Sequence, residues 1–74
     1  MDNYHITKDA TYWSLRKEGA ALPSKTAGTK DELIHLAQAF LADKTASLKI
    51  HKEDGTFEEE RTYPRSADPS SSVG

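Results

Sequence analysis

Three histidines are the residues of this chain best suited to metal or proton chemistry: His5, His35 and His51. A metal site needs several nitrogen, sulfur or oxygen donors that converge on one point. The patterns described below place His5 and His51 on outward faces of strands, and His35 on a helix opposite its apolar stripe. We therefore expect three separate, solvated histidines, no metal site and no cofactor.

Three consecutive glutamates, Glu58, Glu59 and Glu60, are the second candidate, because paired carboxylates can act as acid and base. Alternation along a strand puts Glu58 and Glu60 on one face and Glu59 on the other. The spaced oxygen ligands of a calcium loop are missing here. The run is typical of a charged edge strand, which resists edge-to-edge aggregation.

Nucleophilic catalysis lacks its required parts in this sequence. Ser14 and Ser24 have no Gly-x-Ser-x-Gly context and no evident base, and the glycines form no phosphate loop. We expect no catalytic residues and no enzyme activity from a single copy. An enzyme would require an oligomer in which several chains build one pocket around Glu58, Glu60 or His51.

A small basic and aromatic group is the only candidate nucleic-acid contact, and it consists of Tyr12, Arg16, Lys17 and Lys25. Phosphate-driven binding grows with the number of cations that reach the nucleic-acid backbone. Three cations on a chain of net charge -2 give little of that attraction. We therefore expect ordinary solvated strand charges, with weak, salt-labile nucleic-acid binding through the first hairpin as the alternative.

Length and composition indicate one small domain. The chain has 74 residues and no cysteine, so it has neither a disulfide framework nor a thiolate metal site. No apolar run approaches the roughly 20 residues that a membrane span needs. Residues 1–30 carry five basic and three acidic side chains, and residues 31–74 carry five and nine. We expect a cytoplasmic protein with no membrane contact and an acidic C-terminal half.

A helix is predicted from Asp31 to about Lys44. Thr29-Lys30-Asp31-Glu32 is a capping box, in which the threonine hydroxyl accepts the free amide of Glu32. Acidic residues at the first turn and Lys44 at the last suit the helix dipole. One apolar stripe follows the helical period and comprises Leu33, Leu36, Ala37, Phe40 and Leu41.

Two hairpins flank this helix. Alternating residues predict strands at 4–7 and 12–18 before it, and at 46–51 and from Phe57 after it. Lys52-Glu53-Asp54-Gly55 suits a four-residue loop with glycine in the left-handed conformation. That loop sets Ile50 opposite Phe57 and Lys49 opposite Glu58. Ser24-Lys25-Thr26 is either a loop or a short edge strand, and we favour the strand slightly.

The resulting fold class is α+β, with one helix packed on one face of a mainly antiparallel sheet and the order β-β-α-β-β, plus the short extra strand near 24–26. Residues 1–64 form the single domain, and 65–74 form a disordered polar tail. Strand order is left open. The predicted core, in which Trp13, Phe40 and Phe57 meet, comprises Tyr4, Ile6, Trp13, Leu15, Leu33, Leu36, Ala37, Phe40, Leu48, Ile50 and Phe57.

Four segments carry a resemblance: YHITKD, YWSLRKEGA, SKTAGTKDEL and HKEDGTFEEERTYP. In this order and spacing they resemble a family of small bacterial proteins, domain of unknown function 2188. The resemblance covers the chain nearly to Pro64 and implies the family's fold and a bacterial cytosolic origin, but no activity. Ala27 stands where members tend to carry a bulky apolar residue, which weakens the case for the short third strand.

The expected function is that of a non-catalytic binding or accessory module that acts through a sheet face or an exposed edge, because edge strands are ready templates for partners. The candidate partner surface consists of Lys49, His51, Glu58 and Glu60. An unknown protein partner is expected, and the chain itself should be a monomer or a weak homo-oligomer.

Overall fold

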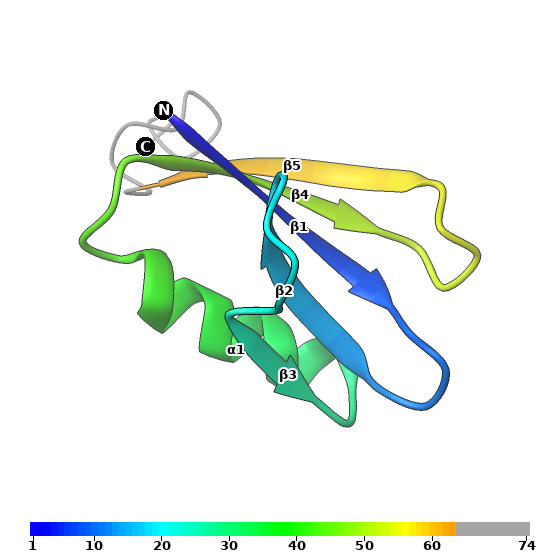
Figure 1. The fold of residues 1–74 in the computed structure, drawn as a ribbon. Coiled ribbons are helices and arrows are strands. Elements are labelled where there is room, and N and C mark those ends of the chain that lie inside the picture. Colours follow the sequence, from blue (N-terminus) through cyan, green and yellow to red (C-terminus); the bar gives the residue numbers. More distant parts are fainter. Residues whose placement is uncertain (64–74) are drawn as a thin grey trace, which may run out of the picture.

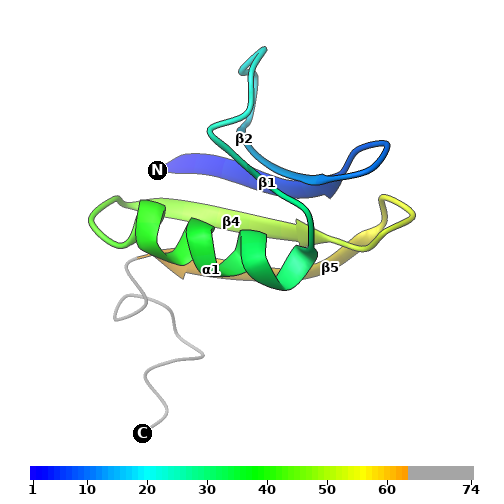
Figure 2. The same cartoon turned by 90° about the horizontal axis from the view of Figure 1, so that it is seen from below.

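The structure is a computed structural model that describes residues 1–63. Pro64 and the predicted disordered tail lie outside the described residues. The elements follow in the order β1 (Asp2–Lys8), β2 (Trp13–Lys17), β3 (Lys25–Ala27), α1 (Lys30–Leu41), β4 (Ala46–His51) and β5 (Phe57–Tyr63). The five strands form one sheet in the order β3-β2-β1-β4-β5, and α1 lies along one face of it (Figures 1 and 2).

The predicted α+β class is confirmed, but the sheet is mixed because β1, its central strand, and the neighbouring β4 run parallel. The reason is the third strand, which forms at Lys25–Ala27 beside β2. Each successive strand or helix up to β4 runs opposite to the element before it. With β3 in place, α1 returns the chain so that β4 starts in the same direction as β1. Without β3, the same helix would have delivered an antiparallel β4.

The N-terminus of α1 forms as predicted. Thr29 has an extended backbone and its Oγ1 accepts the N–H of Glu32 at 3.2 Å. The helix ends earlier in the chain than predicted, at Leu41 and not near Lys44. The N–H of Lys44 donates to the carbonyl oxygen of Leu41 at 3.0 Å, a tight turn that closes the helix and leads into β4.

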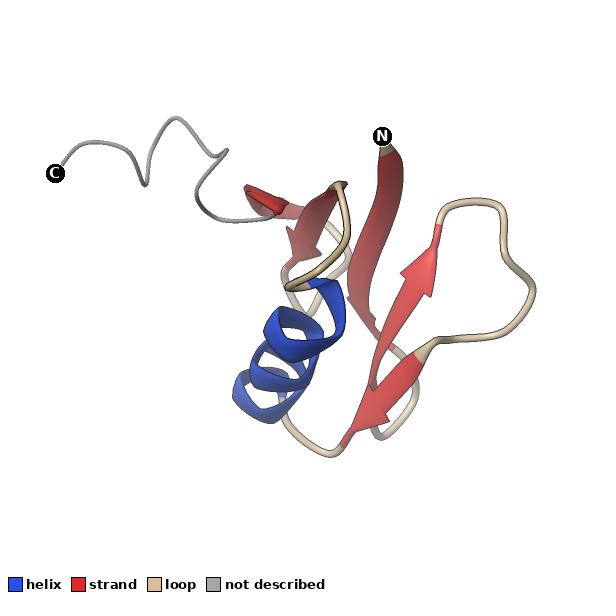
Figure 3. Ribbon diagram, turned by 90° about the vertical axis from the view of Figure 1, so that its left-hand side faces the viewer, coloured by secondary structure: helices blue, strands red, loops and turns tan. Residues whose placement is uncertain are grey.

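The core lies between α1 and the sheet (Figure 3). Phe57 was predicted to be buried there with Trp13 and Phe40, but its side chain is 55 % exposed. Leu36 and Phe40 pack at the margin of the core and are partly buried. Leu41, a member of the predicted helical stripe, is also buried in the core. Three buried residues that the sequence pattern did not single out complete it: Ala27, Ala46 and Tyr63.

The β4–β5 hairpin turns where predicted but pairs differently. Gly55 has φ +92°, and its N–H donates to the carbonyl oxygen of Lys52 at 2.9 Å, as the predicted loop requires. His51, rather than Ile50, lies opposite Phe57, and a bulge follows between Ile50 and His51. The pairing of His51 with Phe57 shifts the register by one residue from the predicted one, and the bulge, which adds one residue to β5, shifts it by one more. Lys49 therefore faces Glu60, and the predicted pairs Ile50–Phe57 and Lys49–Glu58 are wrong.

The bulge also separates the three glutamates in a way that simple alternation did not predict. Glu58 turns toward α1 and forms an ion pair with Lys30. Glu59 pairs with Arg61 at 3.0 Å, which raises the pKa of that guanidinium above its ordinary value. Glu60 points to the other side of the sheet, toward Ser47. Glu58 and Glu60 therefore do not share a face.

Within residues 1–63, no helix has the length and apolar character that a membrane crossing would require.

The corrected core predicts unequal effects of two substitutions. Leu48→Ala removes a fully buried side chain and should lower the free energy of unfolding by about 2–5 kcal/mol. Phe57→Ala removes a half-exposed ring and should cost about 1 kcal/mol or less. Urea denaturation of both variants checks this expectation, and equal losses would show that Phe57 is a core residue after all.

The β4–β5 turn predicts a pH dependence. Asp54 accepts the Thr56 hydroxyl at 2.7 Å and the Thr56 N–H at 3.0 Å, and these bonds hold the pKa of Asp54 below its ordinary value. A carboxyl whose pKa is lower in the folded chain stabilises it above the unfolded pKa, and this stabilisation is lost as pH falls through the folded pKa. Asp54→Ala should therefore be less stable than the unsubstituted protein at neutral pH.

The difference between the two proteins should shrink as the solution is acidified from about pH 5 to pH 2. Urea denaturation at a series of pH values measures it. A difference that stays constant down to pH 2 would show that the carboxylate charge plays no part in the turn.

Candidate functional site on the open face of the sheet

The sheet face opposite α1, here called the open face, is polar. Strand alternation and the register between strands decide which side chains lie on it. They are Asn3, His5 and Thr7 on β1, Ser14 and Arg16 on β2, Thr26 on β3, Ser47, Lys49 and His51 on β4, and Phe57, Glu60 and Thr62 on β5. Among the residues that the structure describes, no helix or strand covers this face (Figure 3).

Two histidines meet on the open face. His5 Nδ1 lies 3.0 Å from His51 Nε2, although the residues are 46 positions apart in the chain. The parallel pairing sets His5 beside Lys49, so His51 is its diagonal neighbour two residues further along β4. The prediction that the histidines do not converge is wrong for this pair, and it failed because the strand order was unknown.

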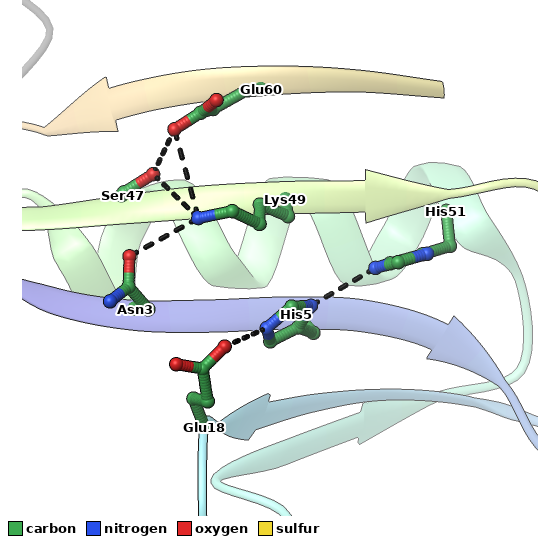
Figure 4. Close-up of polar contacts among 7 residues, drawn as sticks. All are labelled: Asn3, His5, Glu18, Ser47, Lys49, His51 and Glu60. Atoms are coloured by element: carbon green, nitrogen blue, oxygen red, sulfur yellow. Dashed lines mark hydrogen bonds and ion pairs between the residues drawn. The ribbon is translucent and has the colours of Figure 1, made fainter. Parts of the chain in front are cut away.

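The outer nitrogen of each ring also has a partner. His5 Nε2 lies 2.9 Å from Glu18 Oε1 (Figure 4). His51 Nδ1 lies 3.0 Å from the carbonyl oxygen of Gly55. The Glu18–His5–His51 chain of contacts therefore ends on the backbone of the β4–β5 turn. In addition, the ring of Phe57 stands edge-on to His51, with centroids 6.4 Å apart.

These partners determine where the ring protons lie. An ionised carboxylate and a backbone carbonyl can only accept, so His5 Nε2 and His51 Nδ1 must both carry a proton and donate it. In two neutral rings, the inner nitrogens would then face one another as two lone pairs at 3.0 Å. The pair is satisfied only when one cation lies between His5 Nδ1 and His51 Nε2.

A second polar cluster lies beside the histidine pair and is centred on Lys49. Its Nζ donates to Asn3 Oδ1 at 3.2 Å and lies 3.7 Å from Glu60 Oε2. Ser47, which is buried, donates to the same Glu60 oxygen at 2.5 Å (Figure 4). The cluster therefore ties β1, β4 and β5 together across the open face and neutralises the Lys49 charge locally.

Comparison of this chain with models of protein families gives a match. The model described as "Uncharacterized protein conserved in bacteria (DUF2188)" matches residues 4–63, which include all five strands and the helix except for the first residues of β1. The chain belongs to this family. Comparisons with curated proteins and with solved structures give no match.

In this DUF2188 protein, the open face brings together three of the four residues predicted for a partner surface. Lys49, His51 and Glu60 share it, whereas Glu58 is held on the helix side by Lys30. The sequence pattern did not single out Asn3, Glu18 or Ser47, and it kept His5 apart. The one available signal was the alternation of Asn3 and His5 along β1, which placed them on a common outward face.

The predicted nucleic-acid set is divided between the two faces. Arg16 lies on the open face, whereas Lys17 and Lys25 lie on the helix face. Lys17 Nζ is 3.7 Å from Asp2, and Lys25 Nζ lies 5.7 Å from the centre of the Phe40 ring. Tyr12 sits in the turn before β2. The four residues therefore do not form one basic patch.

The remaining candidates lie apart from the open-face clusters. His35 is exposed on α1, and Ser24 is exposed before β3. Ser14 is buried and its hydroxyl donates to Asp9 Oδ2 at 2.9 Å. Within residues 1–63, no three histidine, cysteine or acidic side chains converge as a metal-binding group, and no pocket is found.

The histidine pair predicts fixed tautomers. At neutral pH, long-range nitrogen–proton NMR should detect a proton on Nε2 of His5 and on Nδ1 of His51, because their partners accept hydrogen bonds only. Glu18→Ala should release His5 from this preference and leave His51 unchanged. His35, which is exposed on α1, serves as the internal control. A His51 ring with no proton on Nδ1 would contradict the arrangement.

Proposed function

We propose that this DUF2188 protein is a non-catalytic binding module whose open face contacts another protein. The observation that carries the proposal is that the open face combines fixed polar clusters with two groups available to a partner, Arg16 and Phe57. Arginine and large aromatic residues are the side chains most enriched among the energetically dominant contacts of protein interfaces.

Arg16 is the natural anchor for an acidic group. Its Nη1 donates to the carbonyl oxygen of Ala21 at 3.2 Å, and no acidic side chain within residues 1–63 forms an ion pair with it. Lys49, by contrast, is already matched by Glu60. A partner carboxylate at Arg16 would accept a charge-assisted hydrogen bond without displacing an internal ion pair.

Phe57 supplies the apolar contact at the other side of the same face. Its ring is 55 % exposed and is held edge-on by His51. Arg16 on β2 and Phe57 on β5 are three strand spacings apart, which is roughly 14 Å. Contacts this far apart, on a part of the chain in which no pocket is found, suit a protein better than a small molecule, which would bind a concave site.

The two sheet edges are less suited to strand addition. β3 has only three residues. β5 carries the bulge and the glutamate run, both of which oppose edge-to-edge pairing. The open face is therefore preferred over an edge as the partner surface.

Matched substitutions test this proposal. Tagged protein is used to capture partners from a bacterial extract. Each captured protein is then purified and titrated with the binding module. Arg16→Ala and Phe57→Ser should each weaken the interaction about tenfold or more. Lys17→Ala removes the neighbouring cation from the opposite face, and Leu22→Ser removes an exposed apolar side chain from the β2–β3 loop; both should bind like the unsubstituted protein.

Amide NMR shifts in the purified complex should map to open-face residues of β1, β2, β4 and β5. A retained protein that loses affinity equally for the Arg16 and Lys17 variants, or that shifts α1 instead, would contradict the proposal. If the Arg16 and Lys17 variants lose salt-labile binding to nucleic acid equally, the result favours the alternative function of a nucleic-acid-binding module. The assignment is also overturned if the tagged protein captures no partner whose binding depends on Arg16 or Phe57.

A further inference from the structure

We propose that His5 Nδ1 and His51 Nε2 together bind one divalent late transition-metal ion, Cu²⁺ most tightly, in an exposed site on the open face. Water completes the coordination, because no third histidine, cysteine or acidic side chain within residues 1–63 joins the pair. The site does not depend on the protein partner proposed above.

The outer hydrogen bonds are those of metal-binding histidines. A histidine that ligates a metal through one nitrogen nearly always donates its other N–H to a carboxylate, a backbone carbonyl or water, which fixes the ring and raises its basicity. His5 has the carboxylate of Glu18 in that position at 2.9 Å. His51 has the carbonyl of Gly55 at 3.0 Å. Both inner nitrogens are thereby left as electron-pair donors.

The inner nitrogens face one another and need a cation between them. At 3.0 Å, two imidazole lone pairs repel unless a proton or a metal ion is shared. A metal ion that imidazole prefers can accept both lone pairs at once.

The separation of the two nitrogens selects among metals. At bond lengths of about 2.0 Å, nitrogens 3.0 Å apart subtend roughly 95° at a shared ion. That angle is close to the one between neighbouring ligands of a tetragonal or octahedral ion, the arrangement preferred by Cu²⁺ and Ni²⁺ with nitrogen and oxygen donors. Tetrahedral Zn²⁺ would need a wider angle. Cu²⁺ also stands highest in the general order of divalent affinities.

Each ring must turn by roughly 40° to receive the ion, because the two bonds of an angle of roughly 95° lie about that far from the line between the nitrogens. Their centroids lie 5.2 Å apart and their planes differ by 31°, so the nitrogens meet nearly head-on. Rotation about the last side-chain bond of histidine is soft, and both rings stand at a partly exposed surface. This turn aims the two lone pairs at a point above the sheet.

Two cations flank His5, Arg16 on β2 and Lys49 on β4. Arg16 Nη1 donates to the carbonyl oxygen of Ala21 at 3.2 Å. Glu18 places a negative charge on the far side of His5. Lys49, the cation next to His5 on β4, directs its ammonium group away from the histidines, toward Asn3, Ser47 and Glu60 (Figure 4).

The test uses the full chain without an affinity tag, stripped of metal and titrated separately with Cu²⁺, Ni²⁺ and Zn²⁺ by calorimetry. We expect one ion per chain and the tightest binding for Cu²⁺. His5→Ala and His51→Ala should each weaken Cu²⁺ binding about tenfold or more. His35→Ala removes an exposed histidine from α1 and is the matched control, expected to bind as the unsubstituted chain does.

A second measurement needs no variant. Paramagnetic Cu²⁺ should broaden NMR signals first at His5, His51 and the residues beside them, and its electron paramagnetic resonance spectrum should report two nitrogen ligands from imidazole. The inference is overturned if His35→Ala loses as much affinity as the other variants, or if broadening centres elsewhere. It is also overturned if the NMR signals of His5 and His51 persist at saturating Cu²⁺.

Discussion

The parallel pairing of β1 with β4 at the centre of the sheet is the constraint on which the rest of the structure depends. Among residues 1–63, it is the only strand pairing that joins the N-terminal and C-terminal hairpins into one sheet. Its register brings Tyr4 beside Leu48 and Ile6 beside Ile50, which builds the middle of the core on the helix face. On the open face, the same register brings His5 next to Lys49 and within reach of His51.

Features that depend on neighbouring residues could be predicted from the sequence. The Thr29 cap and the Gly55 turn each rest on interactions a few residues apart, and both formed as expected. The relative direction of β1 and β4 could not be predicted in the same way, because it depends on whether three residues around Lys25 pair with β2. Ala27 is small, yet it is buried and pairs with Trp13, so the strand needs no bulky residue there.

Only part of the candidate site could be predicted from the sequence, for the same reason. Alternation correctly placed Lys49 and His51 on an outward face, but it could not show that β1 lies beside β4 and supplies His5. The bulge in β5 was the other hidden feature. Phe57 is exposed because it pairs with the outward-facing His51. The added residue turns Glu58 toward α1 and leaves Glu60 with Lys49, and an alternation pattern cannot show where such a residue falls.

The separation of the two histidines along the chain has a consequence for the order of folding. Each hairpin and α1 can form from contacts between near neighbours, whereas the β1–β4 pairing must close a long loop and bear its entropy cost before any contact rewards it. His5 and His51, 46 residues apart, come together only at that closing step. Their contact is therefore a marker of the completed tertiary structure: a chain with both hairpins and the helix formed, but with the two halves undocked, would have its secondary structure and no histidine pair.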